Sequence, residues 1–301
     1  MSTCADIPFM QAARAEDQAC ATPSSRNVHR EIWRDGLHNS SERPVPEETP
    51  VAMVYDGSTY AVMMATPEDL EDFAIGFSLT EGVVRSAADI QSIDLVRSGN
   101  GIELRMWLAH GDSRRLSERR RRIAGPTGCG LCGIESLAES VRPAEIVGVG
   151  RHFTPGQIMA AMQSIPPLQK LNIETRAVHA AAFWQSSRGV VALREDVGRH
   201  NALDKLAGAL RRDGVAGSDG IVVLTSRVSV EMVQKASVIG ASVIVSVSAP
   251  TALAVRVANE AGITLAAIAR ADGFEVFTRG DRISPDPRAD VEFFGASDLS
   301  L

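Results

Sequence analysis

The spacing of hydrophobic residues changes about halfway along the chain. In the first half, two β-rich runs flank an Asp-Gly pair at residues 56 and 57, and this pattern predicts a hairpin. An apolar stripe at helical spacing follows, and we expect this helix to begin with Thr66 as its N-cap and Pro67 in its first turn. Strands are predicted at residues 51–55, 60–65, 90–96, 102–108 and 114–123. These elements predict a small α+β domain over residues 46–125.

The second half alternates short apolar strands with amphipathic helices. A hairpin is predicted at residues 179–184 and 190–193, and further strands at 221–225, 242–247, 263–268 and 276–278. Helices are predicted at residues 154–165, 198–212, 229–239 and 250–261. Such alternation indicates an α/β domain over residues 151–301, with a parallel or mostly parallel sheet and helices on both faces.

Two segments do not fit either domain. Residues 1–45 are rich in Ala, Ser, Arg, Glu and Pro without sustained periodicity, so we expect a mobile leader with a short strand near residues 28–33. Residues 126–150 are expected to form a glycine-rich loop and a short connecting helix. The sequence assigns no role to the leader.

Composition narrows the class of protein. Hydrophobic residues make up 45% of the 301 residues and charged residues 23%, which is ordinary for a globular protein. The net charge of −6 argues against a nucleic-acid partner, and no apolar run approaches the roughly 20 residues of a membrane span. The N-terminus lacks the features of a signal peptide, and the four cysteines favour a reducing compartment, so we expect a cytoplasmic protein.

The cysteine pair of the glycine-rich loop is the strongest candidate for chemistry. Cys129 and Cys132 form a C-x-x-C among four glycines, after an arginine-rich stretch and before a predicted helix. Arginine side chains and a helix N-terminus both favour the thiolate, so the pair indicates sulfur chemistry. Two alternatives stay open at this point, a zinc site and a thioredoxin-type dithiol. Zinc is disfavoured because Cys4 and Cys20, the only other cysteines, lie in the leader.

Polar residues gather where the strands of the second half end. Because ligands of open α/β sheets bind beyond the carboxyl ends of the strands, these residues form a candidate binding site. Three of the loops lead into predicted helix N-termini, which bind anions, and their arginines suit phosphates. The alternative is that they are helix caps with solvated arginines. The loops cover residues 195–201, 225–229, 248–251 and 270–273.

Three stretches together resemble the FdhD family of formate dehydrogenase accessory proteins. They are residues 128–133 (Gly-Cys-Gly-Leu-Cys-Gly), 195–205 (Glu-Asp-Val-Gly-Arg-His-Asn-Ala-Leu-Asp-Lys) and 226–236 (Ser-Arg-Val-Ser-Val-Glu-Met-Val-Gln-Lys-Ala). The resemblance implies a cytidine-deaminase-like fold for the second half, a three-layer domain with a mixed sheet. The two helix starts that hold zinc in deaminases contain no cysteine here, so we expect no zinc and no deamination.

The resemblance also implies an activity. Members of the family act as sulfurtransferases: they accept sulfur from a cysteine desulfurase as a cysteine persulfide. They pass it to the molybdenum bis-(pterin guanine dinucleotide) cofactor, for use in formate dehydrogenase. Carried onto this chain, Cys129 accepts the sulfur and Cys132 assists its release. We also expect a homodimer, for which the sequence offers no direct pattern. The alternative is a non-catalytic chaperone that binds the cofactor.

The resemblance places cofactor contacts on the loops of the second half. The expected cofactor-binding residues are Asp196, Arg199, His200, Ser226, Arg227, Ile268, Ala269, Arg270, Ala271, Asp272 and Gly273. One departure concerns the family's T-G-G-x-H pattern before the first strand, which reads Thr-Arg-Ala-Val-His at residues 175–179 here. His179 is therefore either a ligand contact or simply the first residue of a strand.

Overall fold

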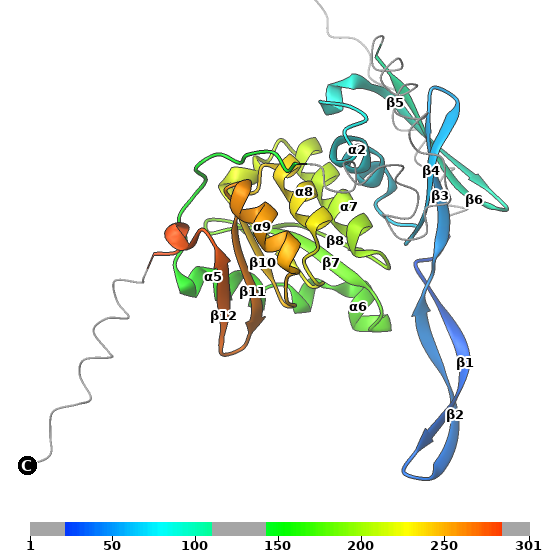
Figure 1. The fold of residues 1–301 in the computed structure, drawn as a ribbon. Helices are drawn as coiled ribbons and strands as arrows, with labels where there is room; N and C mark the ends of the chain where they lie inside the picture. The colour runs from blue at the N-terminus through cyan, green and yellow to red at the C-terminus, as the bar shows by residue number, and fades with distance from the viewer. Residues whose placement is uncertain (1–21, 110–142, 285–301) are drawn as a thin grey trace, which may run out of the picture.

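The small domain is a four-stranded sheet covered by one helix. The computed structural model describes residues 22–109 and 143–284 of the chain (Figure 1). The sheet has the order β4-β3-β6-β5, in which β3 and β6 run parallel and the outer pairs run antiparallel. Its elements are β3 (Thr49–Tyr55), β4 (Ser58–Ala65), α2 (Leu70–Thr80), β5 (Ile90–Ser98) and β6 (Gly101–Leu108). Buried side chains of α2 and of the sheet form one core, so the predicted α+β unit is confirmed over its described part.

The start of α2 differs from the sequence prediction. Asp56 and Gly57 both have positive φ, as a two-residue hairpin turn requires, and the β3–β4 hairpin forms as expected. The helix, however, begins at Leu70 after Asp69, so Thr66 is not its N-cap. Thr66 is fully buried and instead bonds to the large domain, a long-range contact that local capping rules cannot predict.

The large domain is built on a six-stranded mixed sheet with the order β12-β11-β10-β9-β7-β8. The central strands β9, β10 and β11 are parallel, whereas β7 and β12 run antiparallel to their neighbours. The strands are β7 (His179–Gln185), β8 (Gly189–Asp196), β9 (Ile221–Leu224), β10 (Val243–Ser246), β11 (Thr264–Arg270) and β12 (Gly273–Thr278). Each was predicted to within a few residues, and the central strands β9 and β10 are the clearest because their residues are all buried and mostly apolar.

Helices cover both faces of this sheet (Figure 1). The helices α7 (Arg199–Arg212), α8 (Val230–Ile239) and α9 (Ala252–Glu260) pack on one face, and α5 (Pro155–Gln163) packs on the other. The short helix α6 (Lys170–Thr175) precedes β7, and 3-10 turns lie at Ala87–Asp89, Pro166–Leu168, Gly217–Asp219 and Gly280–Arg282. The three-layer α/β arrangement is thus confirmed, while its likeness to cytidine deaminases stays a prediction.

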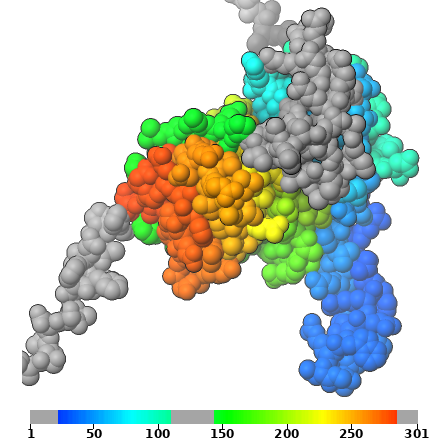
Figure 2. Space-filling view, viewed as in Figure 1, coloured from blue at the N-terminus to red at the C-terminus, as the bar shows by residue number. Residues whose placement is uncertain are grey.

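A hairpin arm stands where a mobile leader was predicted. Strands β1 (Ser25–Arg34) and β2 (Leu37–Pro46) pair along their whole length and project from the body of the molecule (Figures 1 and 2). The predicted strand at residues 28–33 lies within β1, but the rest of the leader prediction is wrong for residues 25–45, which form an ordered hairpin. Polar residues lie on both faces of the arm, so its sequence shows no sustained apolar alternation. Trp33 and Leu37 near its tip are 70% and 75% exposed.

The two domains meet through α2 and α7. A Cβ atom on Gly76 would lie 1.7 Å from the carbonyl oxygen of Asp204, so the helices are in backbone contact. Buried ion pairs flank this contact, including Asp72 with Arg194 at 2.6 Å and Asp204 with Lys235 at 2.9 Å. Burial alone would lower the pKa of Lys235, but Asp204 and Glu81 outweigh it and raise the pKa above its usual range. Within the described part of the chain, no helix has the length and apolarity to cross a bilayer.

Candidate functional site

The carboxyl ends of four strands line up at one end of the large sheet, which we call its carboxyl edge. Because β7 is antiparallel to both β8 and β9, the latter two point the same way as β10 and β11. The loops after Asp196, Leu224, Ser246 and Arg270 therefore emerge along the same edge, as the sequence predicted. Hydrogen bonds link these loops. Ser246 Oγ donates to the carbonyl oxygen of Ser226 at 2.7 Å, and Arg270 Nη1 donates to that of Val247 at 2.6 Å.

Asp196 lies beneath this edge and has no exposed surface. One carboxylate oxygen accepts the N–H of Gly198 at 2.7 Å and Nδ2 of Asn201 at 3.0 Å. The other accepts the N–H of Thr66 at 3.0 Å and lies 2.7 Å from Nζ of Lys205. With all its oxygen atoms engaged inside the protein, Asp196 holds the turn that precedes α7. It would act on a ligand through Arg199 and His200 rather than by contact.

The N-termini of α7 and α8 lack side-chain caps. Neither Gly198 before α7 nor Ser229 before α8 provides a capping hydrogen bond, whereas Thr154 caps α5 and Thr251 caps α9. Uncapped N–H groups of the first turn are free to bind an anion. Within the described part of the chain, buried Nε of Arg199 and Oγ of Ser229 also have no hydrogen-bond partner. Buried polar atoms without partners indicate a missing ligand or water.

A histidine–carboxylate pair bridges the same two helices. Nε2 of His200 on α7 lies 2.7 Å from Oε2 of Glu231 on α8. Burial would raise the pKa of Glu231, but the hydrogen bond with His200 and the nearby cations outweigh it and lower the pKa. Half-buried His179 at the start of β7 belongs to this group. Its pKa is lowered by burial and by the charges of Arg199 and His200. Arg199 brings a fixed positive charge to this group, which suits an anionic ligand.

The segment 268–273 stands at the end of β11. Ile268 has φ of 53°, a strained backbone conformation for a β-branched residue, and the pairing of β11 with β12 is irregular there. Such strain gathers at binding sites. Ala269 is buried, whereas Arg270, Ala271 and Asp272 are exposed at the hairpin turn before Gly273. Ser226 is buried and Arg227 exposed, so of the two only Arg227 presents its side chain to solvent.

Several predicted features lie outside the described residues. These are Cys129, Cys132, the arginine-rich stretch, the strand at residues 114–123 and the connecting helix. Thr66 and Glu231 belong to the site region but were not predicted as site residues, whereas Ser229 lies in the predicted loop at residues 225–229. Only the position of Glu231 inside the motif at 226–236 could have indicated it.

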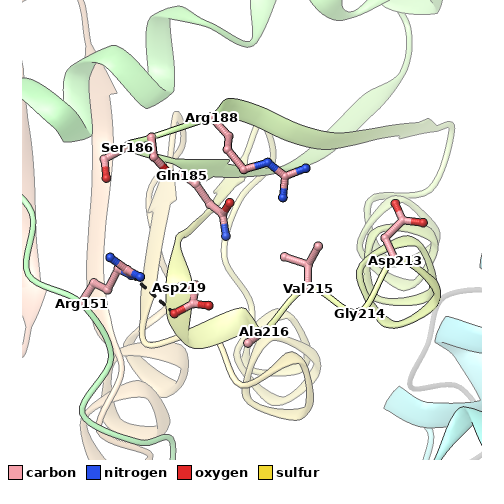
Figure 3. Close-up of a pocket in the computed structure, with 10 residues that line it drawn as sticks. Arg151, Gln185, Ser186, Arg188, Asp213, Gly214, Val215, Ala216 and Asp219 are labelled. Carbon is pink, nitrogen blue, oxygen red and sulfur yellow. Dashed lines mark hydrogen bonds and ion pairs between the residues drawn. The ribbon is translucent and has the colours of Figure 1, made fainter.

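A separate hollow lies at the opposite edge of the sheet (Figure 3). It has a volume of about 360 Å³ and is lined by the β7–β8 turn and the loop after α7. Figure 3 shows the side chains of Gln185 and Arg188 on one side of the hollow, with Val215 opposite and Arg151 beside Asp219. Nε of Arg151 lies 3.4 Å from Oδ1 of Asp219. None of the predicted site residues lines this hollow, so we do not assign the predicted cofactor contacts to it.

Comparisons with known proteins assign the chain to a family. The chain is similar to the crystal structure of a putative formate dehydrogenase accessory protein from Desulfotalea psychrophila, with a TM-score of 0.69 at 24% identity. The similarity covers 87% of this chain and 100% of that chain. The sequence model of the FdhD/NarQ family matches residues 46–284. The chain therefore belongs to the FdhD/NarQ family.

Named relatives are close in sequence. A protein of Agrobacterium fabrum named sulfur carrier protein FdhD is 51% identical over 261 residues, which is 86% of this chain and 96% of the relative. A protein of the same name from Cupriavidus necator is 47% identical over 283 residues, covering 94% and 98% of the two chains. The family model begins at residue 46, so nearly all of the hairpin arm precedes it.

Proposed function

We propose that this chain is a sulfur carrier for formate dehydrogenase. In this proposal it accepts sulfur from a cysteine desulfurase as a persulfide and passes it to the molybdenum bis-(pterin guanine dinucleotide) cofactor. The observation that carries the proposal is membership of the FdhD/NarQ family at about half identity to relatives named sulfur carriers. The C-x-x-C of Cys129 and Cys132 supplies the chemistry that a sulfur carrier requires.

The two thiols suffice for a balanced transfer. The thiolate of Cys129 attacks the desulfurase persulfide and takes over its outer sulfur atom. The thiolate of Cys132 then attacks Sγ of Cys129, which breaks the sulfur–sulfur bond and releases hydrosulfide. A disulfide between the two cysteines remains, so the two electrons that reduce the sulfane sulfur come from the pair itself. Two equivalents of a cellular thiol then reduce this disulfide to the two cysteine thiols and leave as their own disulfide.

The edge of the large sheet fits the cofactor as the bound substrate. Each guanine dinucleotide carries phosphates, and the uncapped N-termini of α7 and α8, with Arg199 and Ser229, provide donors for them. His179 and His200 add polar contacts. The strained segment at 268–273 supplies a further contact, with Arg227 exposed on a neighbouring loop. We assign the cofactor to this edge, and zinc has no part in the proposal.

Two copies of the chain match the two ends of the cofactor. Because the cofactor carries two guanine dinucleotides and each chain has one such edge, the proposed working form is a homodimer in the cytoplasm. Light scattering of the purified protein should give twice the chain mass. A monomer at micromolar concentration, with or without the nucleotide, would contradict this part of the proposal.

Intact-mass measurement tests the carrier chemistry. The protein is incubated with an active cysteine desulfurase and cysteine, and its mass is recorded before and after reductant. We expect a gain of one sulfur atom that reductant removes and that Cys129→Ala abolishes. Cys20→Ala serves as the matched control and should retain the gain. No gain in the parent protein would overturn the carrier role.

The alternative is a non-catalytic chaperone for the cofactor. It rests on the ligand-binding character of the described edge, which needs no cysteine. A Cys129→Ala protein that still fully activates formate dehydrogenase in a reconstituted assay would favour the chaperone. Loss of activation in Cys129→Ala, together with unchanged nucleotide binding, would favour the carrier.

A further inference from the structure

Thr66 of the small domain forms hydrogen bonds with the turn before α7 and with α7 itself. It follows β4 and is fully buried. Its hydroxyl accepts the N–H of Val197 at 3.1 Å, and its own N–H donates to Oδ2 of Asp196 at 3.0 Å. Its carbonyl oxygen accepts a hydrogen bond from Nζ of Lys205 at 2.8 Å. All three polar groups of one residue are therefore committed to the other domain.

These bonds fix the turn before α7 from two sides. Asp196 holds the N–H of Gly198 at 2.7 Å, while the hydroxyl of Thr66 holds the N–H of Val197. Asn201 ties the same turn to the small domain, because its Nδ2 bonds both Asp196 and the carbonyl oxygen of Met64. The turn is thus held without a side-chain cap on α7, which leaves the first-turn N–H groups of the helix for a ligand.

We infer that Thr66 is a positioning residue for the nucleotide-binding start of α7. Through the turn at Val197 and Gly198 it sets the direction of Arg199 and His200, although it belongs to a different domain from theirs. The inference rests on the proposed function, in which this edge holds a guanine dinucleotide. A residue behind a binding site matters because small displacements of the contacting groups weaken binding strongly.

The chain offers a matched control at the same domain junction. Thr80 ends α2 and is also buried, and its hydroxyl donates to Oδ1 of Asp204 at 2.6 Å. It also accepts a hydrogen bond from Nζ of Lys235 at 3.1 Å. Thr80 therefore makes hydroxyl contacts between the domains as Thr66 does, but none of them reaches the turn before α7. A purely structural effect of losing a buried hydroxyl should be at least as large at Thr80.

The first readout is the affinity for GDP, which carries the guanosine and phosphates of the proposed ligand. We expect Thr66→Val to weaken GDP binding by about tenfold, as loss of a supporting partner typically does. Thr66→Ser retains the hydroxyl and should bind within about twofold of the parent, and Thr80→Val likewise. The inference is overturned if Thr66→Val binds as well as the parent, or if Thr80→Val loses as much affinity.

The second readout is amide hydrogen exchange at residues 197–201, which needs no ligand. If the parent protein does not bind GDP, the assignment of the cofactor to this site is wrong. The role of Thr66 is then tested by hydrogen exchange alone. Faster exchange of these amides in Thr66→Val than in Thr80→Val supports the positioning role. Equal exchange in the two variants overturns it.

Discussion

Gly208 of α7 lies directly against the backbone of Asp72 in α2. A Cβ atom on Gly208 would stand 1.9 Å from the carbonyl oxygen of Asp72, closer than any real contact. Gly76 makes the reciprocal approach to Asp204. The two domains are therefore joined by two glycines in backbone contact, and the buried ion pairs around them depend on this close approach.

We predict that Gly208→Ala destabilises the protein by at least about 1–3 kcal/mol, since overpacking forces the helices apart. Urea unfolding of the full chain measures the change. Gly156→Ala is the matched control, because Gly156 is also helical and its Cβ would meet nothing closer than 3.8 Å. The control should be neutral or stabilised by up to about 1 kcal/mol. Equal stability of the two variants would refute the proposed packing.

The buried pair of Lys205 and Asp196 allows a second prediction. Both side chains are 0% exposed. Lys205→Met leaves the carboxylate of Asp196 buried without a charge partner, and we expect a loss of about 3–5 kcal/mol. The double variant Lys205→Met with Asp196→Asn removes both charges and should be less destabilised than the sum of the single variants, by about 0.5–3 kcal/mol.

An exposed pair provides the comparison for this experiment. Arg105 and Glu103 lie 2.8 Å apart, with 46% and 41% of their side chains exposed. Arg105→Ala should change stability by less than about 1 kcal/mol, because water and salt screen the pair. If Lys205→Met costs no more than Arg105→Ala, the buried pair does not stabilise the junction.

Local patterns predicted most elements of the fold. Thr154 and Gln157 form the capping box of α5, and an apolar run defines β9. Both elements can therefore be predicted from a few neighbouring residues. Only a short strand at residues 28–33 was predicted for the hairpin arm, because polar residues lie on both of its faces and no core imposes an apolar alternation. Thr66 escaped prediction because its partners lie about 130 residues further along the chain.

The motif at residues 195–205 shows why site residues are harder to predict. Its polar residues suggested a binding surface as a group. The structure separates them, since Asp196, Asn201, Asp204 and Lys205 are buried toward the small domain. Arg199 and His200 remain at the edge of the sheet. The sequence alone does not distinguish a charged residue that is buried against another domain from one that binds a ligand.

His179 gives a prediction for pH. Its folded pKa lies below the usual 6.5 because burial and the charges of Arg199 and His200 disfavour the proton, although Asp196 opposes them. The stability that neutral His179 contributes is therefore complete above pH 6.5 and is lost as the pH falls through the lowered value. An NMR titration of the histidine ring should show this lowered pKa.

The variant Arg199→Gln removes a positive charge that lowers the pKa of His179, so this pKa should rise toward 6.5. Arg227→Gln is the control, because this exposed arginine is not among the charges that act on His179. An unchanged pKa in Arg199→Gln would mean that Arg199 does not face His179 in solution.

The backbone of Ile268 provides the last prediction. Its φ of 53° costs about 1–2 kcal/mol for a residue with a side chain, and glycine does not pay this strain. In Ile268→Gly, relief of this backbone strain offsets part of the stability that is lost with the side-chain packing. The free energy of unfolding should therefore fall by less than about 1.5 kcal/mol.

Ile283 is the comparison, since it is also partly buried but has an ordinary φ of −107°. Ile283→Gly recovers no strain and should lose about 2–4 kcal/mol in the same urea experiment. If Ile268→Gly is the more damaging variant, the left-handed conformation at the end of β11 is not strained in the folded protein. The binding role that we attach to this segment would then lose its energetic support.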